Sequence, residues 1–439
     1  MGAWETLEII NLQRRYYYSE SCLKKAEKVI PLGSQTFSKS KIQYPFGVSP
    51  FFATHAKGAY VYDVDGHQYL DFVNSLAAIT LGYQDPDVVE AVKKQLDKGS
   101  IFTLSSPLEC QVAEKIIDMV PCAEMVRFGK NGTDATSAAI RLARAYTNRD
   151  HVAVCGYHGW QDWYIGTTAR NLGVPKETQA LTHTFNYNDL ASLSSIFDQY
   201  PSKIAAVIME PVNAICPEEG YLKSVQDLAK KNGAVFIFDE TITGFRYANG
   251  GGQEFFNITP DLACFGKGLA NGYPLSAVVG KREIMKKMED IFFSGTFGGE
   301  TLSLAAADAV LNKLQSEPVV KTLWSLGETL QNKLSQLIKN KELTQVFNVS
   351  GYPVWSFFNI NDTSYATSYE LKTLMLQEMF KNNILALGTH NMSYAHHENH
   401  IVELIQSYNV FFEKVKVARN IGIESLLDCK VLEPLFKVR

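Results

Sequence analysis

Short apolar runs alternate with helical patterns through the middle of the chain. These runs are rich in β-branched or aromatic residues and are apolar on both faces, as strands covered on two sides must be. They lie at residues 125–128, 152–155, 204–209, 234–238, 263–265 and 275–279. Because helical patterns such as 133–146 separate them, we predict a mostly parallel central sheet of the α/β class.

The two ends of the chain carry different patterns. A helical stretch at 21–30 precedes a segment containing Pro, Gly and Ser at 31–50. Towards the other end, amphipathic helices expected at 319–341 and 400–418 flank strand-like runs at 346–349 and 354–359. We therefore expect an N-terminal segment (1–60), a large domain (61–320) and a smaller α+β domain (321–439).

One helix of the large domain has both of its ends marked in the sequence. Ser224 with Asp227 three residues later follows the capping-box pattern and predicts a helix start there. Gly233 predicts the end of the same helix.

Composition limits the classes of function. The 439 residues are 46% hydrophobic and 20% charged, an ordinary globular mixture. A balance of 42 basic and 46 acidic residues argues against nucleic acid or an anionic membrane as partner. No apolar run approaches the ~18 residues of a membrane helix, and residues 1–6 lack a secretory signature. Seven cysteines without a CxxC pair indicate reduced thiols, so we expect a cytoplasmic protein.

Two charged residues follow predicted strands at the edge where open α/β sheets bind ligands. Asp239 follows the apolar run 234–238, where a carboxylate is partly desolvated and needs a cationic partner. Lys267 lies between two glycines after the run 263–265, and a lysine in such a restricted site can act as an imine-forming nucleophile. The alternatives are a helix cap or loop ion pair for Asp239 and a surface lysine for Lys267.

Two loops at the same edge add an anion site and an aromatic ring. Asn131, Gly132 and Thr133 open a helix whose free amides and dipole favour an anion, although an ordinary helix cap explains them as well. Tyr157, flanked by Gly156 and Gly159, is placed to stack on a planar cofactor, although core aromatics in a tight loop are the commoner case.

Together these signals place an amine, a carboxylate, an anion cradle and an aromatic ring at one sheet edge. This set fits pyridoxal 5'-phosphate (PLP), with an imine on Lys267, Asp239 against the pyridine nitrogen and the phosphate at the helix start.

Further motifs in matching order cover nearly the whole chain, at 62–66, 132–135, 141–144, 157–159, 210–212, 238–246, 260–262, 266–267 and 294–296. With them the chain resembles a class III, fold-type I PLP-dependent aminotransferase of the glutamate-1-semialdehyde aminomutase-like branch. The resemblance implies a fold-type I transferase whose small domain combines the C-terminus with the N-terminal segment. It also implies a homodimer with shared active sites, small-molecule substrates and ping-pong transfer from an amino-acid donor to a carbonyl acceptor.

The resemblance further implies a role for each site residue. Lys267 would be the Schiff-base lysine and proton shuttle, and Asp239 would pair with the pyridinium. Thr296 would reach the phosphate of the neighbouring subunit. The remaining implied cofactor contacts are Asn131, Gly132, Thr133, Tyr157, His158, Glu210 and Thr241.

Around the substrate the chain departs from the aminomutase pattern. A Ser-Trp-Gly-Pro run is replaced by Ser-Leu-Ala-Ala at 75–78, and the arginine that would bind the substrate carboxylate is replaced by Lys39. No arginine stands at 388–396, where many ω-aminotransferases carry one. The candidate substrate residues are Lys39, Lys130, Trp160 and Trp163. Their rings and donors suit a polyhydroxylated carbonyl, so we expect a keto-sugar or surface-polysaccharide precursor as acceptor.

Other interpretations stay open at this stage. The same scaffold serves aminomutases and amino-acid epimerases, and a PLP-binding protein without turnover belongs to a different class. His396, His397 and His400 crowd one turn, and His396 and His400 share a helix face, so a metal pair is conceivable. No third ligand or catalytic glutamate has the spacing of zinc proteases. We therefore expect polar residues that open a helix, and no metal.

Overall fold

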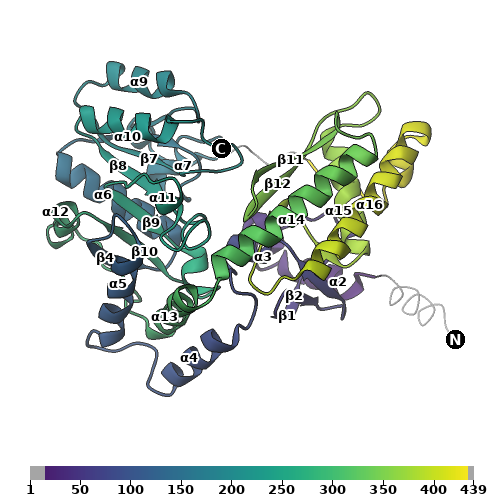
Figure 1. Ribbon diagram of the computed structural model, residues 1–439, viewed down its shortest axis with the longest axis horizontal. Helices are drawn as coiled ribbons and strands as arrows, with labels where there is room; N and C mark the ends of the chain where they lie inside the picture. The colour runs from purple at the N-terminus through teal and green to yellow at the C-terminus, as the bar shows by residue number, and fades with distance from the viewer. Residues whose placement is uncertain (1–14, 434–439) are drawn as a thin grey trace. The chain divides into compact units, whose positions relative to one another are not determined.

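The larger sheet of the protein has seven strands in the order β4-β10-β9-β8-β7-β5-β6 (Figure 1). In the computed structural model, which describes residues 15–433, they are β4 (Met125–Gly129), β5 (His151–Cys155), β6 (Thr182–Thr184), β7 (Ile204–Met209), β8 (Val235–Asp239), β9 (Leu262–Phe265) and β10 (Ser276–Gly280). β10 runs antiparallel to both of its neighbours, and β5 to β9 pair in parallel. The predicted mostly parallel sheet is therefore confirmed, and only the short edge strand β6 was not anticipated.

Both faces of this sheet are covered, which explains why its strands are apolar throughout. Val235 and Ile237 point into a core that also contains the buried face of α6 (Gly132–Thr147). Phe236 and Phe238, which alternate with them, point into a second core with α9 (Leu190–Gln199) and α10 (Tyr221–Lys231). The strands thus lie between two helical layers, and their carboxyl ends form one exposed edge.

α10 corrects the capping prediction. The helix begins at Tyr221 after Gly220, which has a φ of 74°, so Ser224 lies one turn inside it. The Ser224 hydroxyl donates to the Gly220 carbonyl (3.0 Å) instead of capping a free N–H. Starting at Tyr221 buries both Tyr221 and Leu222 in the core, which a start at Ser224 would not do. Gly233, with a φ of 67°, follows the helix end as predicted.

Contacts along the chain divide it into two units. Of the described residues, one unit contains 15–74, 82–84 and 323–433, and the other contains 75–81 and 85–322. The seven-stranded sheet belongs to the second unit, whose other helices are α4 (Pro86–Leu96), α5 (Pro107–Met119), α7 (Asp162–Ile165), α8 (Lys176–Gln179), α11 (Gly252–Phe255), α12 (Arg282–Met285) and α13 (Thr301–Ser316).

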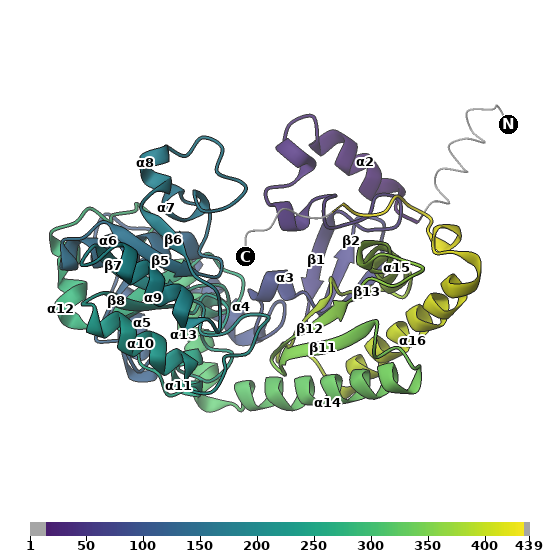
Figure 2. The ribbon, with the colours of Figure 1, turned by 90° about the horizontal axis from the view of Figure 1, so that it is seen from above.

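The first unit joins the two ends of the described chain in one α+β fold (Figure 2). Its four-stranded sheet has the order β1-β2-β3-β13, in which β13 (Ile384–Leu385) pairs in parallel with β3 (Gln68–Asp71). The other strands are β1 (Ala53–Lys57), β2 (Tyr60–Asp63), β11 (Phe347–Tyr352), β12 (Trp355–Ile360) and β14 (Thr389–Asn391). The helices are α2 (Tyr17–Ala26), α14 (Val319–Asn340), α15 (Ser368–Lys381) and α16 (Glu398–Ile421). Within residues 15–433, no helix has the length and apolar character needed to cross a membrane.

Candidate active site

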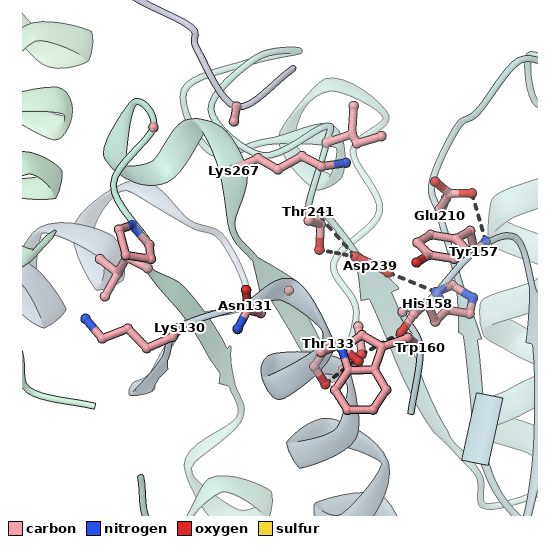
Figure 3. A pocket seen from close by; sticks show the side chains of 18 of the residues that line it. Lys130, Asn131, Thr133, Tyr157, His158, Trp160, Glu210, Asp239, Thr241 and Lys267 are labelled. Atoms are coloured by element: carbon pink, nitrogen blue, oxygen red, sulfur yellow. Dashed lines mark hydrogen bonds and ion pairs between the residues drawn. The ribbon is translucent and has the colours of Figure 1, made fainter. Parts of the chain in front are cut away.

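The strands of the large sheet end in polar residues that surround a cavity of about 380 Å³ (Figure 3). β4 and β5 are followed by the two predicted loops. Glu210 follows β7, Asp239 ends β8, and Lys267 lies two residues after β9. Of the residues predicted for the site, the cavity brings together Lys130, Asn131, Gly132, Thr133, Tyr157, His158, Trp160, Glu210, Asp239, Thr241 and Lys267. All of them belong to the second unit.

Asp239 is the last residue of β8, and its carboxylate is buried. Oδ1 accepts hydrogen bonds from the Thr241 hydroxyl (2.6 Å) and N–H (3.1 Å), and Oδ2 accepts one from Nδ1 of His158 (2.9 Å). Burial raises the pKa of this carboxyl, but the hydrogen bonds from His158 and Thr241 outweigh burial and leave the pKa below its ordinary value. Asp239 is therefore ionised, and Oδ2 keeps a lone pair for one further donor.

His158 is held from several sides. Nε2 lies 3.1 Å from the Cys155 carbonyl, which can only accept, and Nδ1 faces Asp239, so both ring nitrogens are placed to donate. The His158 carbonyl in turn accepts from the Thr136 hydroxyl (2.8 Å). The structure corrects the prediction for Trp163, which packs in the core parallel to His158 and donates to Ser137. Trp163 is therefore a support for His158 and does not line the cavity.

Close approach of three loops builds the centre of the site. A Cβ on Gly132 would lie 2.9 Å from Cγ2 of Thr241, and a Cβ on Gly266 would lie 3.3 Å from the same atom. The side chain of Thr241 thus sits between the start of α6 and the residue before Lys267. Glycine at both positions allows three strand ends to converge on one cavity.

The start of α6 offers fewer backbone donors than the sequence suggested. The Asp134 carboxylate already accepts the N–H groups of Lys130 (3.0 Å) and Asn131 (2.8 Å). Within the described part of the chain, the buried Thr133 hydroxyl has no hydrogen-bond partner. A buried hydroxyl without a partner is costly, and at a helix N-terminus an anion would satisfy it. This residue is therefore the candidate for binding an anion.

Tyr157 is half exposed at the cavity and follows Gly156, whose φ is 102°. Its N–H donates to Oε2 of Glu210 (3.3 Å), and a Cβ on Gly156 would lie 2.5 Å from the same oxygen. Glycine at 156 is therefore needed for the Glu210 carboxylate to approach the loop. The Tyr157 ring meets Tyr164 edge-on, with the ring planes at 89°.

Lys267 opens the 3₁₀ turn η3 (Lys267–Ala270) directly after β9 and has a φ of 43°. This conformation is uncommon for a residue with a side chain and persists only where the surroundings impose it. The half-buried side chain extends into the cavity on the side of Thr241 and Asp239 (Figure 3).

Lys130 is paired at the cavity wall. Its Nζ lies 3.0 Å from Oε2 of Glu300, and both side chains are mostly buried. Burial raises the pKa of Glu300, but hydrogen bonds from the Ser303 hydroxyl and from Lys130 hold it below its usual value. At this point the charge of the wall residue Lys130 is therefore balanced by Glu300 and is not an isolated positive charge.

Besides Trp163, two predicted residues do not line this cavity. Thr296 is exposed in the loop before α13, and Lys39 is exposed at the end of η2 (Phe37–Lys39) in the other unit. Their predicted roles stay predictions.

The three crowded histidines serve the fold of the first unit. Nε2 of the buried His396 donates to the Asp71 carbonyl (3.0 Å), and Nδ1 accepts the N–H of Ser393 (3.0 Å). His400 pairs with the Tyr60 hydroxyl (3.1 Å) and with the N–H of His397 (3.2 Å). In residues 15–433 no group of three or more His, Cys, Asp or Glu is arranged to hold a metal ion.

Sequence reasoning missed several residues of the cavity wall. Ala78 approaches from the segment before α4, and Thr136, Ile242 and the segment 272–275 complete the wall. Thr136 lies one turn after Thr133 on α6, a spacing that could have signalled it. Ala78 belongs to the run 75–78, which the resemblance already placed near the substrate, whereas Ile242 and the segment 272–275 were not singled out.

The aminotransferase class-III family model matches residues 44–383. The chain belongs to this family. It is 39% identical over 328 residues to a glutamate-1-semialdehyde 2,1-aminomutase of Syntrophobacter fumaroxidans, covering 71% of this chain and 74% of the relative. A 3-aminobutyryl-CoA aminotransferase of Cloacimonas acidaminovorans is 30% identical, with 91% and 97% of the two chains covered. The FumI protein of Sphingopyxis sp. MTA144, solved in a PLP-bound form, has a TM-score of 0.86 at 27% identity, covering 93% of this chain and 99% of that one.

These findings confirm the prediction of a fold-type I, PLP-dependent class III transaminase. The cavity fits the cofactor in two respects that are independent of family membership. The unpartnered Thr133 hydroxyl suits a phosphate oxygen, and the remaining lone pair of Asp239 suits a protonated pyridine nitrogen.

Because the Thr133 hydroxyl has no partner in the described structure, removing it should raise the stability of the apoenzyme and lower its affinity for PLP. Thr133→Val keeps the shape of the side chain, so the apoenzyme should become more stable by about 1 kcal/mol because a buried unsatisfied group is removed. PLP affinity should fall about 10-fold or more because a hydrogen bond to the phosphate is lost. Thermal unfolding of the apoenzyme and PLP titration measure the two effects.

Thr147→Val, at the other end of α6, is the matched control, since its hydroxyl is bonded to the Ala143 carbonyl. It should leave PLP affinity unchanged. Unaltered PLP affinity in Thr133→Val would contradict the assignment of the anion position.

Proposed function

We propose that this transaminase binds PLP through Lys267, Asp239 and the start of α6, and moves an amino group from an amino-acid donor to a polyhydroxylated carbonyl acceptor. The observation that carries the proposal is the convergence of an amine, an ionised buried carboxylate and an unpartnered hydroxyl on one cavity. No single residue of this set would support the function alone.

Asp239 would keep the pyridine nitrogen protonated, because its carboxylate stays ionised and has a lone pair to accept that proton's hydrogen bond. When bound, PLP supplies the electron sink that stabilises negative charge on the carbon carrying the amine. His158 orients Asp239 from behind, and Thr241 holds its other oxygen. Glu210, which accepts the N–H of Tyr157, forms another part of the cavity wall.

Lys267 would hold the cofactor through its ε-amino group until an amino donor takes its place. The released amine then stays beside the reacting carbon, where a flexible side chain can remove and return a proton. The positive φ of Lys267 favours this role, since strained residues cluster at active sites.

The cavity wall that carries Lys130 and Trp160 suggests the class of the acceptor substrate. Lys130 lines the cavity as a hydrogen-bond donor whose charge is balanced by Glu300, an arrangement that suits a hydroxyl group better than a lone carboxylate. Trp160 is 67% exposed and presents an aromatic face at the same cavity. None of the described residues that line the cavity is an arginine. We infer a keto-sugar, of the kind that precedes a surface polysaccharide, as the acceptor.

A second candidate is an aminomutase acting within one substrate. The relatives named glutamate-1-semialdehyde 2,1-aminomutase, of which one is 39% identical, favour it. Such an enzyme needs no external acceptor, so dependence of turnover on an added carbonyl compound separates the two candidates.

We also infer a homodimer with shared active sites. Ile101, Phe102 and Leu104 leave large apolar areas exposed, as do Phe292 and Phe297. The two loops are joined, since the Thr301 N–H donates to the Ser100 carbonyl (2.8 Å). Such an apolar patch is suited to bind a second copy of this chain. Thr296 lies between Phe292 and Phe297 and would then serve the active site of the neighbouring copy.

The role of Lys267 predicts the site of chemical trapping. Borohydride should fix the cofactor on Lys267, and peptide mass spectrometry should find the label there because the amine holds the cofactor covalently. Lys267→Arg should lose at least about 10³-fold in turnover while the fold is kept. Label on another lysine would refute the assignment, and a spectrophotometric screen of amino donors against the holoenzyme would identify the first half-reaction.

The acceptor proposal predicts a selective effect of Trp160→Ala. The KM for keto-sugar acceptors should rise roughly 3–10-fold because aromatic stacking is lost, while the KM for pyruvate should change little. Leu172→Ala is the control, since Leu172 is fully exposed and does not line the cavity. Equal KM changes for both acceptor classes would rule out the sugar-binding role.

The shared site predicts complementation between two inactive dimers. Thr296→Ala should weaken PLP binding, and Lys267→Ala should abolish turnover. Mixed dimers of the two variants contain one intact site, so at a PLP concentration too low to load Thr296→Ala, statistical mixing should restore about a quarter of wild-type activity. Sedimentation should show a dimer, and a fully active monomer would contradict the proposal.

A further inference from the structure

The segment that carries Ala78 into the cavity begins with an unusual backbone. Asn74, Ser75, Leu76 and Ala77, named α3 (Asn74–Ala77), have φ values of 47°, 50°, 61° and 66°. They form one left-handed turn, a conformation that residues with side chains avoid and that Asn and Gly visit most readily. Four such residues in succession require strong contacts on either side.

The entry to this turn is fixed by the buried Asp71. Its Oδ1 accepts the N–H groups of Val73 (2.7 Å) and Asn74 (3.1 Å). Its Oδ2 accepts the hydroxyl of Tyr83 (2.6 Å). These bonds hold the chain up to the first left-handed residue.

The exit of the turn is fixed by Asn271. Its Oδ1 accepts both the N–H of Thr80 and the N–H of Leu81, each at 2.9 Å. The fully buried Arg246 lies behind the same segment and donates to the Ala77 carbonyl (3.4 Å) and the Thr80 hydroxyl (3.3 Å). The two short bonds to Asn271 therefore restrain the exit together with those of Arg246.

Asn271 is also the last residue of the turn that begins with Lys267. It follows η3 and has a φ of 45°, a value that asparagine tolerates. A Cβ on Gly268 would lie 2.5 Å from Oγ1 of Thr80, and one on Gly272 would lie 2.7 Å from Cδ1 of Ile79. The lysine turn and the segment 77–81, here called the strap, are thus packed against each other without a gap.

We propose that Asn271 is a positioning residue that locks the strap to the lysine turn through its side-chain oxygen. This oxygen thereby helps to place Ala78 on the cavity wall and to restrain the strained backbone of Lys267. The inference rests on the proposed role of Lys267 and adds a determinant of how that lysine meets the substrate.

The test compares two substitutions at 271 in the holoenzyme. Asn271→Gly tolerates the positive φ but removes the oxygen, whereas Asn271→Asp keeps an oxygen and also tolerates this φ. The glycine variant should still bind PLP and be labelled on Lys267 by borohydride. Its kcat/KM should fall about 10–100-fold because the lysine and the wall are misplaced, and the pH midpoint of its visible absorbance should shift. The aspartate variant should restore kcat/KM to within about 5-fold of wild type.

Asn148→Gly is the matched control, since Asn148 has a φ of 54° at the end of α6 and is exposed. It should leave the kinetics and the absorbance unchanged. Wild-type kinetics and absorbance in folded Asn271→Gly would overturn the proposal, as would equal losses in the glycine and aspartate variants.

Hydrogen exchange of the wild-type holoenzyme tests the same bonds if the glycine variant does not fold. The Thr80 and Leu81 amides should exchange at least about 100-fold more slowly than amides of the exposed loop around Leu172. Equal rates would overturn the proposal. Absence of borohydride label on wild-type Lys267 would instead overturn the proposed function, so the two failures are distinguishable.

Discussion

A buried carboxylate at the end of an apolar strand governs the architecture of this site. Asp239 leaves water when β8 packs between two helical layers, and it stays ionised only because His158 and Thr241 donate to it. His158 must then be held by the Cys155 carbonyl, Thr136 and Trp163, and Thr241 must fit between Gly132 and Gly266. The hydrogen bonds and contacts that keep the Asp239 carboxylate ionised therefore fix the positions of three loops from distant parts of the chain.

Close approach is the second constraint, and it explains where strain is tolerated. Gly156 and Gly268 leave no room for a side chain beside Glu210 and Thr80. The tight packing that follows supports conformations that would be unfavourable alone, namely the positive φ of Lys267 and the left-handed turn of α3. A rigid wall and a strained lysine are thus two consequences of the same packing. Such preorganisation is what a transaminase needs to place a mobile amine repeatedly beside one carbon.

The opposite wall shows how charge pairing changes the meaning of a residue. Lys130 as an isolated cation would attract an anionic substrate, but the carboxylate of Glu300 balances its charge from behind the cavity wall. The pairing depends on the segment before α13, which lies far from Lys130 in the sequence. The charge balance of this wall is therefore a property of the folded chain.

The amino-acid sequence by itself determined the strands of the large sheet to within about a residue, because buried strands must be apolar. It also determined the positions of Lys267, Asp239 and Thr133, because polar residues collect at the ends of such strands. Periodicity could not reveal β6, whose three residues are too short for a pattern, or the start of α10, where core burial of Tyr221 prevailed over a local cap. Only the tertiary structure decided that Trp163 supports His158, that Lys130 is paired and that Asn271 joins two turns. Each of these depends on a contact between segments distant in the chain, and contacts of that kind leave no local pattern of residues.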